Sequence, residues 1–166
     1  MSAEIRLSTS QLLEELEQLK VWSGPKIAKV FRKTQIPGYE LAPIGSGGFI
    51  NYREKFFFIT NAHVVQTIES GDLFGKIVVP FKDHGNEIVR FISCKMDEEL
   101  DVAVLEIDPV QAQSDSDKLF VDQQCFQDPT QYLDACNFAF VHGFPASQTN
   151  VESDGRTILV ETTSLP

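Results

Sequence analysis

Two residues of the sequence have the types and positions of a general base and a carboxylate that orients it. His63 lies just past the apolar run 56–60, and Asp101 lies directly before the apolar run 102–107. Histidine can accept and return a proton near neutral pH because its ordinary pKa is about 6.5. A carboxylate that accepts the other ring N–H fixes the tautomer and stabilises the imidazolium. The pair therefore predicts a general base with an orienting carboxylate, if the fold brings the two within hydrogen-bond distance.

The segments around these residues form motifs in a fixed order. They are Gly-Ser-Gly at 45–47, Thr-Asn-Ala-His-Val-Val at 60–65, Asp-Val-Ala-Val-Leu at 101–105 and Gly-Phe-Pro at 143–145. In this order the motifs resemble those of trypsin-like serine peptidases, and especially of the bacterial heat-shock (Deg-type) members. The resemblance implies two six-stranded β-barrels with the active site in the cleft between them. It also implies that His63 is the general base and Asp101 its orienter.

A nucleophile motif is missing from this pattern, since the sequence contains no Gly-x-Ser-Gly. In the chymotrypsin template the aspartate follows the histidine by about 45 residues, and the serine follows by about 93 more. His63 and Asp101 are 38 positions apart, so scaling places the serine at about 180–195, beyond Pro166. We therefore expect a serine-type endopeptidase of which this chain holds the His and Asp but not the Ser, inactive as written. The alternatives are a non-catalytic chymotrypsin-like module that binds proteins, and an unrelated all-β domain with accidental motif matches.

Other reactive side chains fit such chemistry less well. Ser46 precedes the histidine and leads into a strand, so its glycine-rich surroundings are interpreted as backbone flexibility. His84, His142 and Cys94 lack the spacing of a zinc site. Cys136 is interpreted as a small buried apolar residue. No metal and no cofactor are expected, because a serine triad needs neither.

The charge of the chain limits its partners. The net charge is −10, and residues 34–166 carry eight basic against twenty acidic side chains. This excess of negative charge repels phosphate backbones and anionic lipids, which disfavours nucleic-acid and membrane partners. The expected partner is a polypeptide substrate or a protein, and the oligomeric state stays open.

The cysteines and apolar runs bear on localisation. Three cysteines form an odd set without a disulfide pattern, which indicates the reducing cytoplasm. The N-terminus lacks the apolar core of a signal peptide, and no apolar run approaches the ~20 residues that span a bilayer. We therefore predict a cytoplasmic location.

Hydrophobic periodicity divides the chain into four parts. Leucines at 12, 13, 16 and 19, then Ile27, Val30 and Phe31, recur at helical intervals, which predicts a helical lead-in over 1–35. Short β-rich runs at 46–52, 55–60, 76–81, 87–94 and 101–107 predict a complete first barrel within 36–110. A polar connection covers 111–136. The start of an incomplete second barrel covers 137–166, with a hairpin turn at Asp154-Gly155. The predicted fold class is an all-β, chymotrypsin-like Greek-key barrel.

Overall fold

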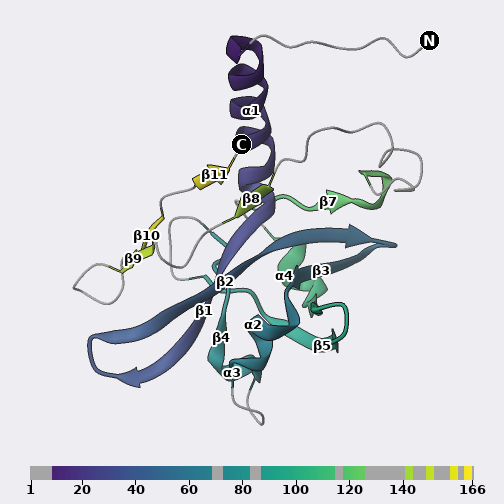
Figure 1. The fold of residues 1–166 in the computed structure, drawn as a ribbon. Coiled ribbons are helices and arrows are strands. Elements are labelled where there is room, and N and C mark those ends of the chain that lie inside the picture. The colour runs from purple at the N-terminus through teal and green to yellow at the C-terminus, as the bar shows by residue number, and fades with distance from the viewer. Residues whose placement is uncertain are drawn as a thin grey trace.

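The computed structural model describes residues 9–68, 73–82, 87–114, 118–125, 141–143, 149–151, 158–160 and 163–165. The chain is mostly β, with a helix at its start and a curled antiparallel sheet (Figure 1). In chain order the elements are α1 (Thr9–Ser23), η1 (Gly24–Lys26), β1 (Ile27–Ile36), β2 (Tyr39–Tyr52), β3 (Lys55–Thr60), α2 (Ala62–Gln66), α3 (Leu73–Lys76), β4 (Ile77–Val78), β5 (Phe91–Asp97), β6 (Val102–Ile107), α4 (Pro109–Ala112), β7 (Val121–Asp122), η2 (Gln123–Cys125), β8 (Val141–Gly143), β9 (Thr149–Val151), β10 (Ile158–Val160) and β11 (Thr163–Leu165). The predicted β-rich class with an N-terminal helix is confirmed.

The main sheet has the strand order β4-β1-β2-β3-β6-β5, and β7 pairs with β2 in parallel. Every neighbouring pair along the main order is antiparallel. An isolated bridge between Pro80 and Ile88 links the chain after β4 to the chain before β5. There the Val89 N–H donates to the Val79 carbonyl at 2.8 Å. The sheet is therefore a curled half-barrel, and the closed Greek-key barrel stays a prediction.

The hydrophobic core lies on one face of this sheet. β6 alternates strictly, with Ala103, Leu105 and Ile107 buried, because successive side chains of a strand point to opposite faces. Fully buried Phe49 and Phe58 face this row from β2 and β3, with ring centroids 5.1 Å apart. β3 also pairs with β6, and in that pairing Thr60 lies opposite Ala103. The end of β3 therefore lies beside the start of β6.

The predicted helical lead-in over 1–35 is wrong beyond residue 26. Residues Ile27–Ile36 form strand β1, which pairs with β2. In β1 the four successive residues 28–31 are all buried, so this part of the strand is covered on both faces. Ile27, Val30 and Phe31 therefore match the i, i+3, i+4 pattern of a helix, although they lie in a strand whose residues 28–31 are buried without alternation.

The predicted connection 111–136 returns to the sheet within the described residues. Leu119 N–H donates to the Pro25 carbonyl at 2.8 Å, and β7 then pairs with β2. The Phe120 ring packs against Phe49 and Phe56, with centroids 5.5 and 4.9 Å apart. Residues 126–140 lie outside the described part. Toward the C-terminus β9 pairs with β10 as the predicted hairpin requires, while its turn residues at 154–155 are also outside it.

The Gly-Ser-Gly-Gly segment, interpreted from the sequence as flexible, forms part of β2. At Gly47 the missing side chain leaves space for the neighbouring strand β3. A Cβ on Gly47 would lie against the Ile59 carbonyl oxygen and 2.5 Å from the Phe58 ring. A Cβ on Gly48 would have the Lys26 carbonyl oxygen, 3.7 Å away, as its nearest neighbour. Close approach of β3 therefore requires glycine at 47 but not at 48.

This difference predicts opposite results for two adjacent substitutions. Gly47→Ala is expected to lower the free energy of unfolding by about 1–3 kcal/mol, because overpacking displaces β3. Gly48→Ala is expected to leave it unchanged or raise it by up to about 1 kcal/mol through the unfolded chain. Urea unfolding of both variants measures the difference. Equal losses would show that the β2–β3 spacing at Gly47 does not limit the fold.

Candidate functional site

His63 and Asp101 meet where β3 ends and β6 begins. The imidazole Nδ1 lies 2.8 Å from Asp101 Oδ2 and 3.0 Å from Oδ1. The backbone N–H of His63 also donates to Asp101 Oδ1 at 3.0 Å. The side chains are 64% and 45% exposed, respectively. Strand pairing therefore brings together two residues 38 positions apart, at a surface that a substrate can reach.

Helix α2 fixes the place of His63. Its apolar residues Ala62, Val64 and Val65 are buried, whereas His63 is exposed. Val64 packs so closely against β2 that a Cβ on Gly45 would lie 2.6 Å from its methyl group. The short helix is thus anchored by its apolar side chains, and the imidazole stands on its open side.

A tight turn presents Asp101. The residue has φ +52°, a left-handed conformation that aspartate, asparagine and glycine adopt more easily than other residues. The turn is closed by the Leu100 N–H, which donates to Asp97 Oδ1 at 3.0 Å. Glycine would fit this backbone with less strain. A carboxylate held in such a conformation beside a histidine is typical of a functional site.

Hydrogen bonds to its charged form lower the pKa of the Asp101 carboxyl. The largest cause is the bond from the His63 backbone N–H, and the bond from the His63 side chain comes next, with the Asn61 amide also contributing. A carboxylate whose pKa is lower in the folded than in the unfolded chain stabilises the fold above its ordinary pKa. That stabilisation is lost as the pH falls through the lowered, folded-state pKa. Asp101 is therefore ionised at neutral pH.

This arrangement determines which imidazole nitrogen can act on a substrate. An ionised carboxylate only accepts hydrogen bonds, so the nitrogen that faces Asp101 carries the proton. The Nε2 atom of neutral His63 is then left with a lone pair that can accept a proton. The pair can act as a general base whose conjugate acid is stabilised by the neighbouring charge.

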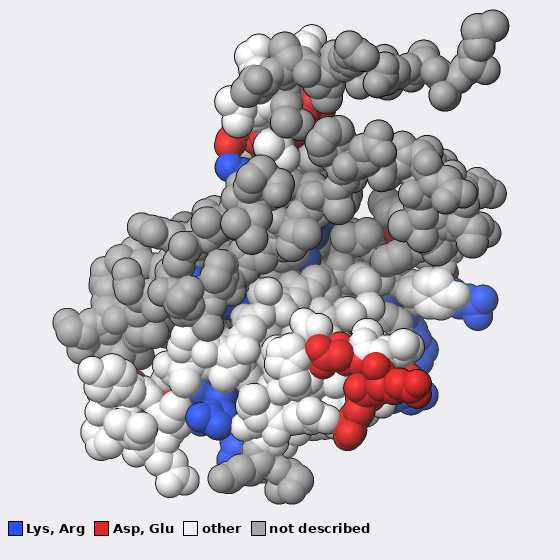
Figure 2. All heavy atoms as spheres, viewed as in Figure 1, with Lys and Arg blue, Asp and Glu red and all other residues white. Residues whose placement is uncertain are grey.

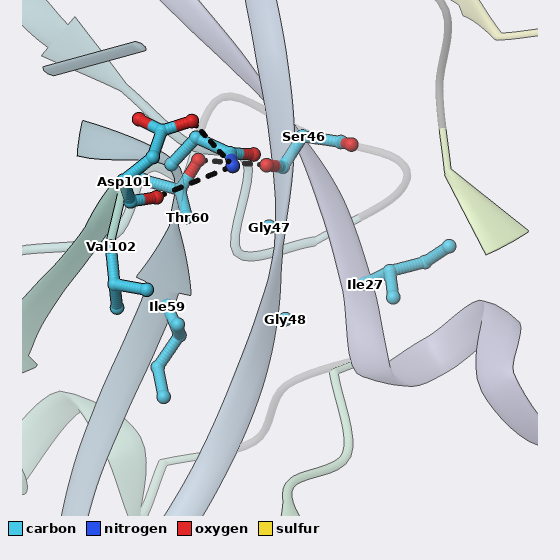
Figure 3. A pocket seen from close by; sticks show the side chains of 9 residues that line it. Ile27, Ser46, Gly47, Gly48, Ile59, Thr60, Asp101 and Val102 are labelled. Carbon is cyan, nitrogen blue, oxygen red and sulfur yellow. Dashed lines mark hydrogen bonds between the residues drawn. The ribbon is translucent and has the colours of Figure 1, made fainter. Parts of the chain in front are cut away.

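A pocket of about 330 Å³ is lined by Asp101 and by Gly47 and Gly48 of β2. In Figure 3, Asp101 and Thr60 stand on one side of the strand that carries Ser46, and Ile27 lies on the other. The Thr60 hydroxyl donates to the Ser46 carbonyl at 2.8 Å, which ties β3 to β2 at the pocket wall. The walls combine apolar side chains with hydroxyl, amide and carboxylate groups.

Charge is unevenly distributed over the surface. In the described part of the face drawn in Figure 2, acidic side chains gather in one area, and lysines and arginines lie at separate points. The turn before Asp101 carries three exposed carboxylates, those of Asp97, Glu98 and Glu99. The site therefore lies beside a concentration of negative charge.

The other reactive residues are placed as follows. Ser46 lies within β2 and lines the pocket. Cys94 is half-buried against the core, and burial raises the pKa of its thiol. His142 belongs to β8, whereas His84 and Cys136 lie outside the described residues.

The described part of the chain offers neither a metal site nor a membrane-spanning helix. No group of three or more His, Cys, Asp and Glu side chains is arranged there to hold a metal ion. Among the described helices, none has the length and apolar character needed to cross a membrane.

Comparisons of the chain with protein-family models, curated proteins and solved structures find no match. The resemblance to trypsin-like peptidases therefore depends on the four motifs alone. The His63–Asp101 geometry is an observation independent of them.

One residue of the site has a role that the sequence did not reveal. The Asn61 side chain donates from Nδ2 to Asp101 Oδ2 at 3.1 Å and to the Asp101 carbonyl at 3.3 Å. The sequence offered one indication of this role, which is the position of Asn61 directly after β3 and two residues before His63. Without the pairing of β3 and β6, nothing in the sequence relates this amide to residue 101.

Proposed function

We propose that the chain carries the general base and orienting carboxylate of a serine-type endopeptidase. The observation that carries this proposal is the 2.8 Å contact between His63 Nδ1 and Asp101 Oδ2 at the β3–β6 junction. His63 accepts the proton of a serine hydroxyl at Nε2 while that oxygen attacks the peptide carbonyl, and later returns it to the leaving amine. Asp101 holds the imidazole in the required tautomer and stabilises its cationic form.

The strand order supports a chymotrypsin-like architecture for this site. In a Greek key, three strands joined in succession are followed by a fourth that lies beside the first, in the order 4-1-2-3. The described sheet has β4-β1-β2-β3 in that order. The bridge between Pro80 and Ile88 brings the chain near its two ends together, as closure of a barrel would require.

The nucleophile is proposed to come from outside the described site. The 166 residues contain no Gly-x-Ser-Gly motif, and the hydroxyl-bearing residue nearest in sequence, Thr60, donates to a backbone carbonyl. Ser46 lies within β2, where it pairs with Lys29 of β1, and it is not on the kind of strained turn that exposes a nucleophile. The proposed mechanism therefore needs a serine that approaches Nε2 from the solvent side of His63.

A fluorophosphonate probe, which reacts with activated serines, tests the proposal. The test protein is the product of the encoding gene, read through any codons that follow Pro166. Labelling is expected, and His63→Ala should abolish it, because loss of the triad histidine lowers rates by about a million-fold. His84→Ala removes a histidine 21 positions further along the sequence and is the matched control.

The result also separates the peptidase from a protein-binding module of the same fold. Labelling that His63→Ala leaves intact would place the reactive serine elsewhere and reject the proposed role of His63. A gene product that folds but shows no labelling would reject the peptidase and favour the non-catalytic module.

A further inference from the structure

Asn61 occupies the position before α2 where an asparagine normally caps the helix. A capping asparagine accepts a hydrogen bond from the backbone N–H two or three residues later through its side-chain oxygen. Here the Asn61 side chain makes no such bond. The Asp101 carboxylate instead accepts the backbone N–H of His63. Asp101, 40 positions away, therefore accepts the N–H that a capping side chain would accept, and the Asn61 amide bonds Asp101 instead.

The orientation of the Asn61 amide follows from the chemistry of its partners. Both groups that it meets, the Asp101 carboxylate oxygen and the Asp101 backbone carbonyl, are hydrogen-bond acceptors. An amide oxygen in that place would face two acceptors, so the nitrogen must point toward them. Asn61 therefore holds the side chain and the main chain of the same residue at once.

Asp101 needs such a hold. Its backbone is left-handed, its side chain is 45% exposed, and the turn bond from its N–H to the Glu98 carbonyl is long at 3.4 Å. The His63 backbone N–H and ring bond only the carboxylate of Asp101, whereas the Asn61 amide also bonds the main-chain carbonyl of the turn.

We propose that Asn61 is a positioning residue that fixes the Asp101 carboxylate and its left-handed turn in the geometry that orients His63. The inference rests on the proposed function for its catalytic meaning. Its structural content, a three-residue unit of Asn61, Asp101 and His63, can be tested without any activity. At an ordinary helix start the asparagine side chain would cap the helix, whereas here the Asn61 side chain makes no capping bond and two bonds to Asp101.

The test follows the titration of the Asp101 carboxyl carbon by NMR in the 166-residue chain. In Asn61→Ala one donor to the charged form is removed, so the pKa of Asp101 should rise above that of the unsubstituted chain. In Asn61→Asp an acceptor of the same shape faces the carboxylate, so the pKa should rise further. His63 on α2 and Asp97, Glu98 and Glu99 in the turn stay the same in both variants, and Asn61→Asp adds one new carboxyl, at position 61, that titrates together with Asp101.

Asn51→Ala is the matched control, because Asn51 lies in β2 and makes no side-chain hydrogen bond in the described part of the chain. It should leave the Asp101 titration unchanged. Circular dichroism checks that each variant is folded, and the isosteric Asn61→Asp serves if Asn61→Ala does not fold.

The outcomes separate this inference from the proposed function. A titration of Asp101 that is the same in the folded Asn61 variants as in the unsubstituted chain would overturn the positioning role, even if stability fell. The rise in the order unsubstituted chain, Asn61→Ala, Asn61→Asp would support it. Neither result depends on fluorophosphonate labelling, which tests the peptidase proposal alone.

Discussion

Replacing Asp101 with asparagine is expected to leave the chain folded and to move the proton of neutral His63 from Nδ1 to Nε2. Asparagine tolerates the left-handed backbone of residue 101, so the turn should survive the change. The backbone N–H of His63 holds the oxygen at the Oδ1 position, so the new NH₂ takes the place of Oδ2. There it faces His63 Nδ1, which must then become the acceptor.

The consequence for catalysis is large because Nε2 loses the lone pair that would receive the serine proton. The corresponding aspartate-to-asparagine change in the triad of a chymotrypsin-type enzyme lowers kcat by about 10⁴ while the geometry is retained. We expect a loss of the same order in a gene product that reacts with the fluorophosphonate probe. The new NH₂ also opposes the Asn61 amide, which removes a second bond of the site.

Two measurements check this expectation. Long-range ¹H–¹⁵N correlation spectra of the imidazole identify the protonated nitrogen, and peptide hydrolysis gives kcat. Glu99→Gln removes one negative charge from the same turn without touching His63 and is the matched control. A retained Nδ1–H tautomer in Asp101→Asn would contradict the assigned hydrogen-bond pattern. A tautomer change without loss of kcat would contradict the role of Nε2 as base.

His63 and Asp101 could be recognised in the sequence as a candidate pair because each lies at the end of a strongly apolar run within an ordered set of motifs. The runs 56–60 and 102–107 are long enough to be recognised, and the polar residues at their ends stand out. The antiparallel pairing of these two strands in the structure then places the end of one run beside the start of the other, and so places His63 beside Asp101. The catalytic use of the pair stays a prediction, which the experiments above address.

Other features depend on contacts that periodicity does not encode. Continuous burial of residues 28–31 makes β1 resemble a helix, since a strand covered on both faces does not alternate and cannot be told from a helix by its period. The space required at Gly47 comes from the approach of Ile59 and Phe58 across the sheet. Such features depend on which strands become neighbours, so the local sequence indicates only that an apolar residue or a glycine is present.

Replacing Phe49 with alanine is expected to lower the free energy of unfolding by about 3–5 kcal/mol. The Phe49 ring is fully buried and lies 5.1 Å from Phe58, 6.4 Å from Phe81 and 5.5 Å from Phe120, measured between ring centroids. It therefore joins β2 to β3, to the chain after β4 and to the chain before β7. Domains of ordinary stability have about 5–15 kcal/mol in total, so the variant should lose a large fraction of its stability.

Urea unfolding measures this loss, and Phe74→Ala, which truncates a ring that is 46% exposed, is the matched control with an expected change below about 1 kcal/mol. Equal losses in the two variants would show that the Phe49 cluster is not the centre of the core. The cluster includes Phe58 of β3, the strand whose end sets His63 beside Asp101. The His63–Asp101 hydrogen bond should therefore break at the same urea concentration as the sheet, seen as coincident changes in circular dichroism and in the His63 ring resonances. Separate midpoints would mean that α2 and the turn at Asp101 hold the pair without the core.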